Sequence, residues 1–353
     1  MTASIEPGAL AGETVSVVVC TYSSERWETL AACIASVHAQ SCRPDELLVV
    51  VDHNEELLAR AAAAFPSVTV LANQAAERGP GGARTTGMER SHGVVVAFID
   101  DDAQAEPSWL EKIIEAFRDP QVMIVGSQVV PRWEASRPPW FPDEFDWVVG
   151  CSYRGQTGGA DVTPVRNVIA NGMAARRASL EAGGFRVDLG RLRGVPLGCE
   201  ETEWCIRVAR HFAGSKVLQL SPAVLVHSVP AARTGVQRFL RHCYAEGLSK
   251  ALVAAAVGST AALASERRYV VRTLPAGVAT RLARAARGDR WALAQAATIV
   301  AGLSAAVAGY VAGHLLPRRG LGRVGGDQAI TRHDGAVQHA WPLTSDRSAR
   351  SHH

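Results

Sequence analysis

The first hundred residues alternate between two hydrophobic patterns. Residues 15–20, VSVVVC, form a continuous apolar run rich in β-branched residues, which is typical of a strand buried on both faces. Residues 25–40 follow with apolar side chains at helical spacing, at Trp27, Leu30, Ile34 and Val37. The same alternation predicts strands at 46–52, 68–73 and 94–100 and helices at 55–65 and 81–93. Strands that alternate with helices at this pitch predict a mostly parallel α/β sheet with right-handed crossovers.

The pattern changes after residue 120. Residues 131–150 are rich in proline and tryptophan, which predicts an irregular, aromatic-lined segment. Around it we expect strands at 123–130 and, shorter, at 224–230, and helices at 179–185, 198–212 and 236–256. The helix at 179–185 should be closed by glycine.

Polar side chains follow the buried strands at the points where these strands end. Strand 15–20 runs into Thr21 and Tyr22, strand 46–52 ends in Asp52, and strand 94–100 ends in the triplet Asp100, Asp101 and Asp102. Three adjacent carboxylates repel one another unless a cation or hydrogen-bond donors hold them. The carboxyl ends of parallel strands meet at one edge of a sheet, where ligands bind. The sequence therefore predicts a polar, cation-binding site at this edge.

Composition narrows the class of protein. The chain has 353 residues, of which 47% are hydrophobic and 20% charged, so a large core is feasible. The net charge of +3 gives no argument for a nucleic-acid partner, and we expect none. Seven scattered cysteines without a CxxC pair argue against a zinc cluster or a disulfide framework and favour the cytoplasm. The N-terminal segment lacks a basic flank and an apolar run, so we expect no signal peptide.

Seven motifs in register carry a resemblance to a known family. In chain order they are VVVCTYSSER, LLVVVDHN, GPGGARTTG, AFIDDDA, ANGMAARR, GGF and GCEETEWCIR. In order and spacing they resemble the inverting family 2 glycosyltransferases of GT-A fold, over residues 13–250. The resemblance implies a Rossmann-like, mostly parallel sheet, a nucleoside-diphosphate sugar donor and a divalent cation, Mg²⁺ or Mn²⁺. Breaking the donor bond leaves charge on the diphosphate, which a carboxylate-held cation can neutralise.

The resemblance also assigns roles to residues at the sheet edge. It implies that Asp102 contacts the metal and that His227, after the strand 224–230, lies near the metal and the diphosphate. A carboxylate at Asp52 would accept a hydrogen bond from the base of the nucleotide, and Arg84 would face the base or the diphosphate. Where the family commonly has asparagine after this arginine, the chain has Thr85. The full set of expected donor-binding residues is Thr21, Tyr22, Asp52, Arg84, Asp100 and Asp101.

A general base is expected at the start of the helix 198–212. If this helix begins near Glu200, then Glu201 shares the inward face with Trp204, Cys205 and Val208, while Glu203 lies off that face. Burial should raise the pKa of Glu201, as a base requires, while the helix N-terminus acts in the opposite direction. The family pattern here is Glu-Asp, with the aspartate as base, and this chain has Glu-Glu. We therefore expect Glu201 to be catalytic, with Glu200 as the open alternative.

The C-terminal third raises the question of membrane contact. Residues 291–316 lack Asp, Glu, Lys and Arg and are long enough to span a bilayer. They are rich in alanine and glycine, which drive insertion weakly, and the basic stretch 281–290 precedes them. We expect a helical extension at 251–317 that contacts the membrane peripherally, and a disordered tail at 318–353.

These observations predict a metal-dependent inverting glycosyltransferase of cell-envelope glycan or polysaccharide biosynthesis. The acceptor would be a hydroxyl or a polyprenyl phosphate, and the aromatic residues of 133–148 would line its site. The segment QRFLRH lacks the Gln-x-x-Arg-Trp motif of processive synthases, so we expect a single transfer per binding event. The protein would act in the cytoplasm, at the cytoplasmic face of the plasma membrane. The alternatives are a nucleotidyltransferase, although CTYSSER lacks its glycines, and a non-catalytic nucleotide-sugar binding protein.

Overall fold

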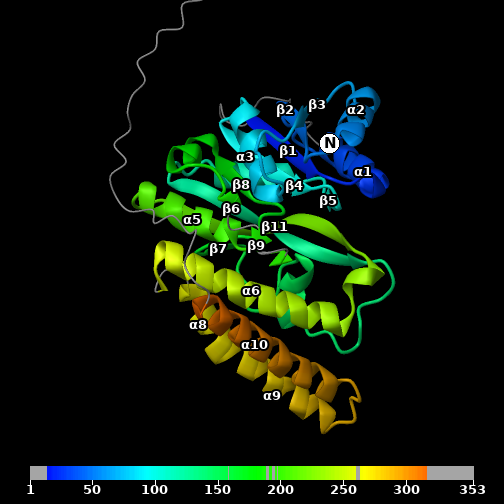
Figure 1. The fold of residues 1–353 in the computed structure, drawn as a ribbon, viewed down its shortest axis with the longest axis vertical. Helices are drawn as coiled ribbons and strands as arrows, with labels where there is room; N and C mark the ends of the chain where they lie inside the picture. The colour runs from blue at the N-terminus through cyan, green and yellow to red at the C-terminus, as the bar shows by residue number, and fades with distance from the viewer. Residues whose placement is uncertain are drawn as a thin grey trace, which may run out of the picture. The chain divides into compact units, whose positions relative to one another are not determined.

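A computed structural model describes residues 14–157, 159–187, 191–192, 195–196, 198–259 and 263–315 (Figure 1). Within these residues, eight strands of the main sheet are ordered β3-β2-β1-β4-β8-β6-β11-β5, and β7 pairs with β11. Their bounds are β1 (Val15–Thr21), β2 (Glu46–Val51), β3 (Thr69–Ala72), β4 (Val95–Asp100), β5 (Ala103–Ala105), β6 (Val122–Trp133), β7 (Val162–Pro164), β8 (Ala174–Arg176) and β11 (Lys216–Val229). A separate two-residue pair joins β9 (Arg191–Leu192) to β10 (Val195–Pro196).

The four N-terminal strands β3, β2, β1 and β4 are all parallel, which confirms the α/β prediction. One face of the sheet is covered by α1 (Trp27–His38), α2 (Glu55–Ala64) and α4 (Trp109–Ala116), whose apolar residues join one core. The other face is covered by α3 (Pro80–Arg90) and α5 (Glu200–His211). Helices on both faces explain why the strands are continuously apolar. They also leave the carboxyl ends of the strands as the open edge of the sheet.

The middle of the chain departs from the sequence prediction at three points. The short strand expected at 224–230 is the second half of β11, whose register shifts between Leu220 and Val224. The helix expected at 179–185 is a 3₁₀ helix, η3 (Arg177–Ala182), which ends at Gly183 with φ of +84°. Residues 131–150 are partly regular: β6 continues to Trp133, and a 3₁₀ helix, η2 (Asp143–Val149), follows. The long strands β6 and β11 pair with each other across about ninety residues of sequence, which local pattern does not report.

The C-terminal part of the described chain is helical. It comprises α6 (Val236–Val257), α8 (Ala264–Arg268), the π-helix η6 (Tyr269–Thr273), α9 (Leu274–Ala285) and α10 (Ala292–Leu315). The domain boundary expected at residue 250 falls within α6, which is continuous. A core of its own joins these helices to η2 through Phe145, Phe239 and Ile299. Residues 1–13, where we expect no signal peptide, lie outside the described residues. Residues 318–353, where we expect a disordered tail, also lie outside them.

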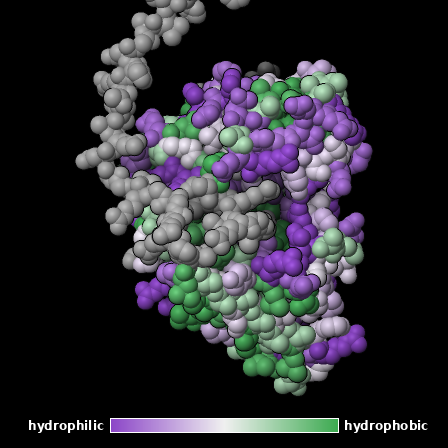
Figure 2. Space-filling view, viewed as in Figure 1, coloured by the Kyte–Doolittle hydropathy of each residue, from purple (hydrophilic) through white to green (hydrophobic). Residues whose placement is uncertain are grey.

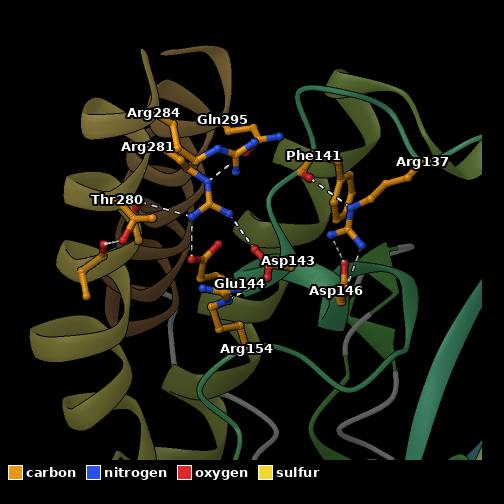
Figure 3. A network of polar contacts seen from close by, with 12 residues as sticks. Arg137, Phe141, Asp143, Glu144, Asp146, Arg154, Thr280, Arg281, Arg284 and Gln295 are labelled. Atoms are coloured by element: carbon orange, nitrogen blue, oxygen red, sulfur yellow. Dashed lines mark hydrogen bonds and ion pairs between the residues drawn. The ribbon is translucent and has the colours of Figure 1, made fainter. Parts of the chain in front are cut away.

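Buried ion pairs fasten this helical extension to η2 (Figure 3). Arg281 of α9, 4% exposed, donates to Glu144 at 2.8 Å and to Asp143 at 2.6 Å. Glu144 is fully buried, so its charge depends on Arg281 for compensation. The Tyr269 hydroxyl adds a hydrogen bond to the Glu144 carbonyl at 2.5 Å. The extension is therefore held against the rest of the chain by polar contacts as well as by its apolar core.

Candidate active site

Asp102 and His227 meet where the turn from β4 into β5 lies beside β11. β5, which directly follows Asp102, pairs antiparallel with β11 so that Ala103 lies opposite His227. This register brings Nδ1 of His227 to 3.2 Å from Oδ1 of Asp102, and both side chains are less than 10% exposed. Sequence analysis predicted this pair from a family pattern, and the structure places the two side chains in contact.

Two arginines reinforce this position. Nη1 of Arg26 lies 3.1 Å from Oδ2 of Asp102, and Nη2 of Arg233 lies 3.5 Å from the same oxygen. Burial by itself would raise the pKa of Asp102, but the hydrogen bond with His227 and the two arginine charges outweigh it and lower the pKa. Asp102 is therefore held as a carboxylate, as a metal ligand must be.

The middle aspartate of the triplet points elsewhere. Asp101 is 1% exposed; it accepts hydrogen bonds from Thr21 Oγ1 at 2.7 Å and from Arg26 at 2.6 Å. Burial raises its pKa to about 6, against the opposing effects of Arg26 and Thr21. Asp101 and Thr21, both expected at the donor, thus bind each other inside the protein, at the turn that joins β4 to β5. Their geometry fits a role in holding Arg26 and the end of β1.

A second series of ion pairs links the sheet edge to α5. Arg84 of α3 donates to Asp100 at 3.0 Å and to Glu200 at 3.2 Å. Asp100 keeps 31% of its side chain exposed, whereas Arg84 and Glu200 are buried. Burial is the main cause that raises the pKa of Glu200 to about 7, and Arg84 only partly offsets it. Glu200 is thus the ion-pair partner of Arg84. Glu201, the next residue, is then the candidate for the general base.

Glu201 lies in the first turn of α5, which begins at Glu200 as predicted. It is half-buried and makes no side-chain hydrogen bond or ion pair with another of the described side chains, whereas Trp204, Cys205 and Val208 are fully buried. Burial raises its pKa, as expected; the Glu246 carboxylate adds to this shift, and Lys250 opposes it. The expectation for Glu203 is wrong: it is 2% exposed, because it forms an ion pair with Arg207 one turn later.

Asp52 and Tyr22 directly follow β2 and β1. Asp52 accepts hydrogen bonds from the Asn73 amide at 2.7 Å and the Gly79 backbone N–H at 2.9 Å. Nδ1 of the neighbouring His53 lies 2.7 Å from Oδ1 of Asp52. Tyr22 is 54% exposed, and the Arg26 guanidinium lies 4.7 Å from the centre of its ring. An exposed aromatic ring is suited to stacking against a nucleotide base.

The α6 helix holds the loop that leads into α5. The Gly198 N–H donates to Ser249 at 3.2 Å, and the Cys199 thiol lies 3.1 Å from Oε1 of Glu246. Lys250 then links Glu246 at 3.4 Å to Glu266 of α8 at 2.9 Å. These contacts fix the start of α5 and therefore the position of Glu201.

Sequence analysis assigned no role to several of the residues that the structure places at this site. Asn171 accepts from the Asp100 N–H at 3.1 Å, and its amide lies 3.4 Å from His227; it belongs to the quoted motif ANGMAARR but had no role. Arg26 likewise stands in the quoted motif VVVCTYSSER. Arg233 and Glu246 had no local signal, because only the tertiary fold brings them to the site.

The donor set fits a divalent cation. A carboxylate and an imidazole in contact are ligands that Mn²⁺ accepts, and a carboxylate suits Mg²⁺. In the described part of the chain no group of three His, Cys, Asp or Glu side chains forms a closed metal cluster. Two protein ligands would leave coordination positions for diphosphate oxygens and water.

Comparison with known proteins agrees with this architecture. Residues 16–182 match the family model described as Glycosyl transferase family 2. The chain is 38% identical, over 240 residues, to the glucosyl-dolichyl phosphate glucuronosyltransferase of Haloferax volcanii, covering 67% of this chain and 76% of that protein. It is 32% identical over 119 residues to the amylovoran biosynthesis glycosyltransferase AmsE of Erwinia amylovora, which covers 33% of this chain and 45% of that one. A mannosyltransferase of Pyrobaculum calidifontis, solved with GDP-Man and Mn²⁺, superposes with a TM-score of 0.55 at 17% identity, over 87% of this chain and 89% of that chain.

The fold and the charged sheet edge define a glycosyltransferase of GT-A fold. The chain belongs to glycosyl transferase family 2, as the length and identity of the Haloferax match show. This membership decides against the nucleotidyltransferase and the non-catalytic binding protein.

Proposed function

We propose that this glycosyltransferase moves a sugar from a nucleoside-diphosphate donor to a hydroxyl of a lipid-linked saccharide, with inversion and with a divalent cation. The observation that carries the proposal is the pairing of Asp102 with His227 beside two arginines. Glu201 follows Glu200, which Arg84 links to Asp100 of the same triplet. A site for negative charge thus accompanies a candidate base. We place the reaction at the cytoplasmic face of the plasma membrane, in cell-envelope glycan synthesis.

The donor would lie along the carboxyl ends of the strands. Asp52 accepts the N–H of the base, Tyr22 lies against the base, and Asp100 faces the ribose. Asp102 and His227 would hold the cation. When bound, the cation neutralises the charge that develops on the leaving diphosphate. Arg26 and Arg233 place further positive charge at the same point, where it favours departure of the diphosphate.

The base step follows from the position of Glu201. Its carboxylate accepts the proton of the acceptor hydroxyl while the hydroxyl oxygen forms a bond to the anomeric carbon. The bond from that carbon to the diphosphate oxygen breaks, and its electron pair leaves with the diphosphate. Attack from the side opposite the leaving group inverts the anomeric centre. Partial burial of Glu201 raises its pKa, which makes its carboxylate a stronger base.

The need for a base separates two classes of acceptor. A phosphate monoester is already ionised at neutral pH and attacks without losing a proton, whereas a hydroxyl must lose one. A half-buried carboxylate beside a second one, Glu246, would also repel a phosphate dianion. The Haloferax relative is named for transfer to a glucosyl-dolichyl phosphate, a lipid-linked sugar. Both considerations favour a sugar hydroxyl over a bare polyprenyl phosphate.

The test is a transfer assay with two matched acceptors, glucosyl polyprenyl phosphate and polyprenyl phosphate of the same chain length. Candidate donors are chosen first by thermal stabilisation of the protein with and without Mn²⁺. We expect transfer to the sugar-bearing acceptor, abolished by chelation and restored by Mn²⁺. Equal transfer to the bare phosphate would contradict the acceptor assignment, and full transfer in chelator would contradict the metal.

A further inference from the structure

The α10 helix has two faces of different character. One face packs on α6 so closely that only glycine fits: a Cβ at Gly309 would lie 2.0 Å from the Tyr244 carbonyl oxygen. On the partner helix, a Cβ at Gly247 would lie 1.8 Å from the carbonyl oxygen of Ala306. The two backbones are therefore in direct contact, and α10 is docked along α6.

The opposite face is apolar and exposed. Large side chains recur along it at intervals of seven and four residues, with exposed fractions from 52% to 79%: Leu293, Val300, Val307, Val311 and Leu315. Only 22% of the most apolar stretch of α10 is buried. Helical spacing places these five side chains on one stripe. In Figure 2, hydrophobic colour gathers at the lower end of the view, where Figure 1 labels α9 and α10. An exposed apolar stripe of this length marks an interaction surface.

Positive charge borders the stripe. At the turn before α10, Arg287 and Arg290 are exposed and Trp291 is 41% exposed, with Arg290 5.6 Å from the tryptophan ring. In η6, exposed Arg272 adjoins Val271, which is 70% exposed. Exposed arginines and an amphipathic tryptophan beside apolar side chains match the interface of a bilayer with anionic lipid. The occupant that this pattern fits is a lipid surface, since a protein partner would not require the arginine border.

The length of α10 would also permit a transmembrane span, but its packing opposes one. A span would carry α10 through hydrocarbon either alone or with α6 attached. Leaving α6 would abandon the backbone contact at Gly247 and Gly309. Taking α6 along would bury its charged residues, among them Arg238 and Arg241, in lipid at high cost.

We propose that α10 lies in the plane of the membrane interface, with the stripe from Leu293 to Leu315 in the acyl region and the flanking arginines on anionic headgroups. The proposal deepens the proposed function by naming the face that meets the bilayer. It does not depend on the identity of the acceptor. The helix is then a monotopic anchor, and its other face remains bound to α6.

The experiment is vesicle flotation of the full-length protein, with vesicles of neutral phosphatidylcholine or of phosphatidylcholine with phosphatidylglycerol. Val300→Glu with Val307→Glu should reduce the bound fraction at least tenfold on both. The matched control is Val162→Glu with Val236→Glu, two valines that are each 51% exposed outside the stripe, and it should bind like wild type. A second stripe variant, Leu293→Glu with Val311→Glu, repeats the test, and thermal melting verifies that each variant is folded. Equal binding by folded stripe variants would overturn the proposal.

Two further arms separate the sources of binding. Arg287→Glu with Arg290→Glu should weaken binding severalfold to anionic vesicles and little to neutral ones. Carbonate should release the wild type, whereas retention until detergent is added would show a span and overturn the in-plane placement. Transfer to a short-chain, water-soluble acceptor should be unchanged in the stripe variants. If wild type floats but transfers no sugar, the proposed function fails while the membrane surface stands.

Discussion

The sheet edge and the helical extension both gather arginines around carboxylates, yet the two sets are built differently. In the extension, Arg281 is 4% exposed and pairs with the fully buried Glu144 and with Asp143, which is 36% exposed; these contacts hold α9 on η2. At the sheet edge, Asp100 keeps 31% of its side chain exposed, and Arg26 is 21% exposed beside Asp102. In the closed set, the Arg281–Glu144 pair is buried, and Oε2 of Glu144 has no hydrogen-bond partner among the described residues. The open set presents charges that a ligand can share.

The comparison teaches how to separate a functional charge cluster from a fastening one. Burying an ion pair costs desolvation, so a pair that is fully enclosed contributes mainly by avoiding an unpaired charge. A pair at an open edge keeps access to a ligand. Substitution should therefore reduce catalysis at one cluster and folding stability at the other.

The largest effect is expected at Asp102. Asp102→Ala should lower kcat/KM by on the order of 10³ or more, because several kcal/mol of charge stabilisation on the diphosphate are lost. Steady-state transfer with titrated Mn²⁺ measures this. Thermal melting verifies that the variant is folded at the assay temperature. Wild-type turnover of Asp102→Ala in chelator would exclude a metal role.

The next effect concerns the base. Glu201→Gln keeps shape and hydrogen bonding but cannot accept a proton, so kcat should fall about 10²–10⁴-fold while donor affinity stays the same. The matched control is Glu200→Gln, which should mainly disturb Arg84 and thereby weaken donor binding. If Glu200→Gln loses turnover and Glu201→Gln keeps it, the assignment of the two residues must be exchanged.

At the enclosed cluster the effect should appear in stability. Arg281→Met leaves Glu144 buried without its cation, which should lower the free energy of unfolding by about 3–5 kcal/mol. Denaturant unfolding measures this. Adding Glu144→Gln should recover part of the loss, because the uncompensated charge is removed. A strong loss of turnover in the folded Arg281→Met protein, with stability unchanged, would show that this cluster is not a fastening one.

The smallest effect is a shift in pH dependence. The base must be deprotonated, so activity rises with pH through the pKa of Glu201, and the nearby Glu246 carboxylate raises that pKa. Glu246→Gln removes the negative charge, so the acid limb of the kcat/KM profile should move to lower pH. Lys250→Met should move it in the opposite direction, because the lysine lowers the pKa. An unmoved limb in both folded variants would mean that α6 only supports the loop before α5.

The sequence predicted those features that local pattern determines. The buried strands and helices from 15 to 100 follow from apolar periodicity, and the start of α5 at Glu200 was also expected. The insertion of β8 between β4 and β6 was not predicted, because three residues such as Ala174–Arg176 carry no strand pattern of their own.

The site was predictable to a similar extent. The edge that carries Asp52, Asp100 and Asp102 follows from strand order alone. The inward turn of Asp101 onto Thr21 and the arrival of Arg233 do not, since both depend on how loops return to the sheet. The buried Glu203 was missed because Arg207, one turn later, satisfies a charge that the hydrophobic pattern places outside.

The continuous α6 helix has a consequence for acceptor choice. Through Gly247, α6 contacts α10, and through the neighbouring Glu246 and Ser249 it holds the loop before α5. With α10 on the membrane surface as proposed, the continuous α6 helix would set the height of Glu201 above the lipid headgroups. An acceptor hydroxyl must stand at that height when its lipid is seated in the bilayer, so glycans that are too short or too long miss the carboxylate. The enzyme would thus measure the length of its acceptor from the membrane surface, and this selection should vanish in detergent solution.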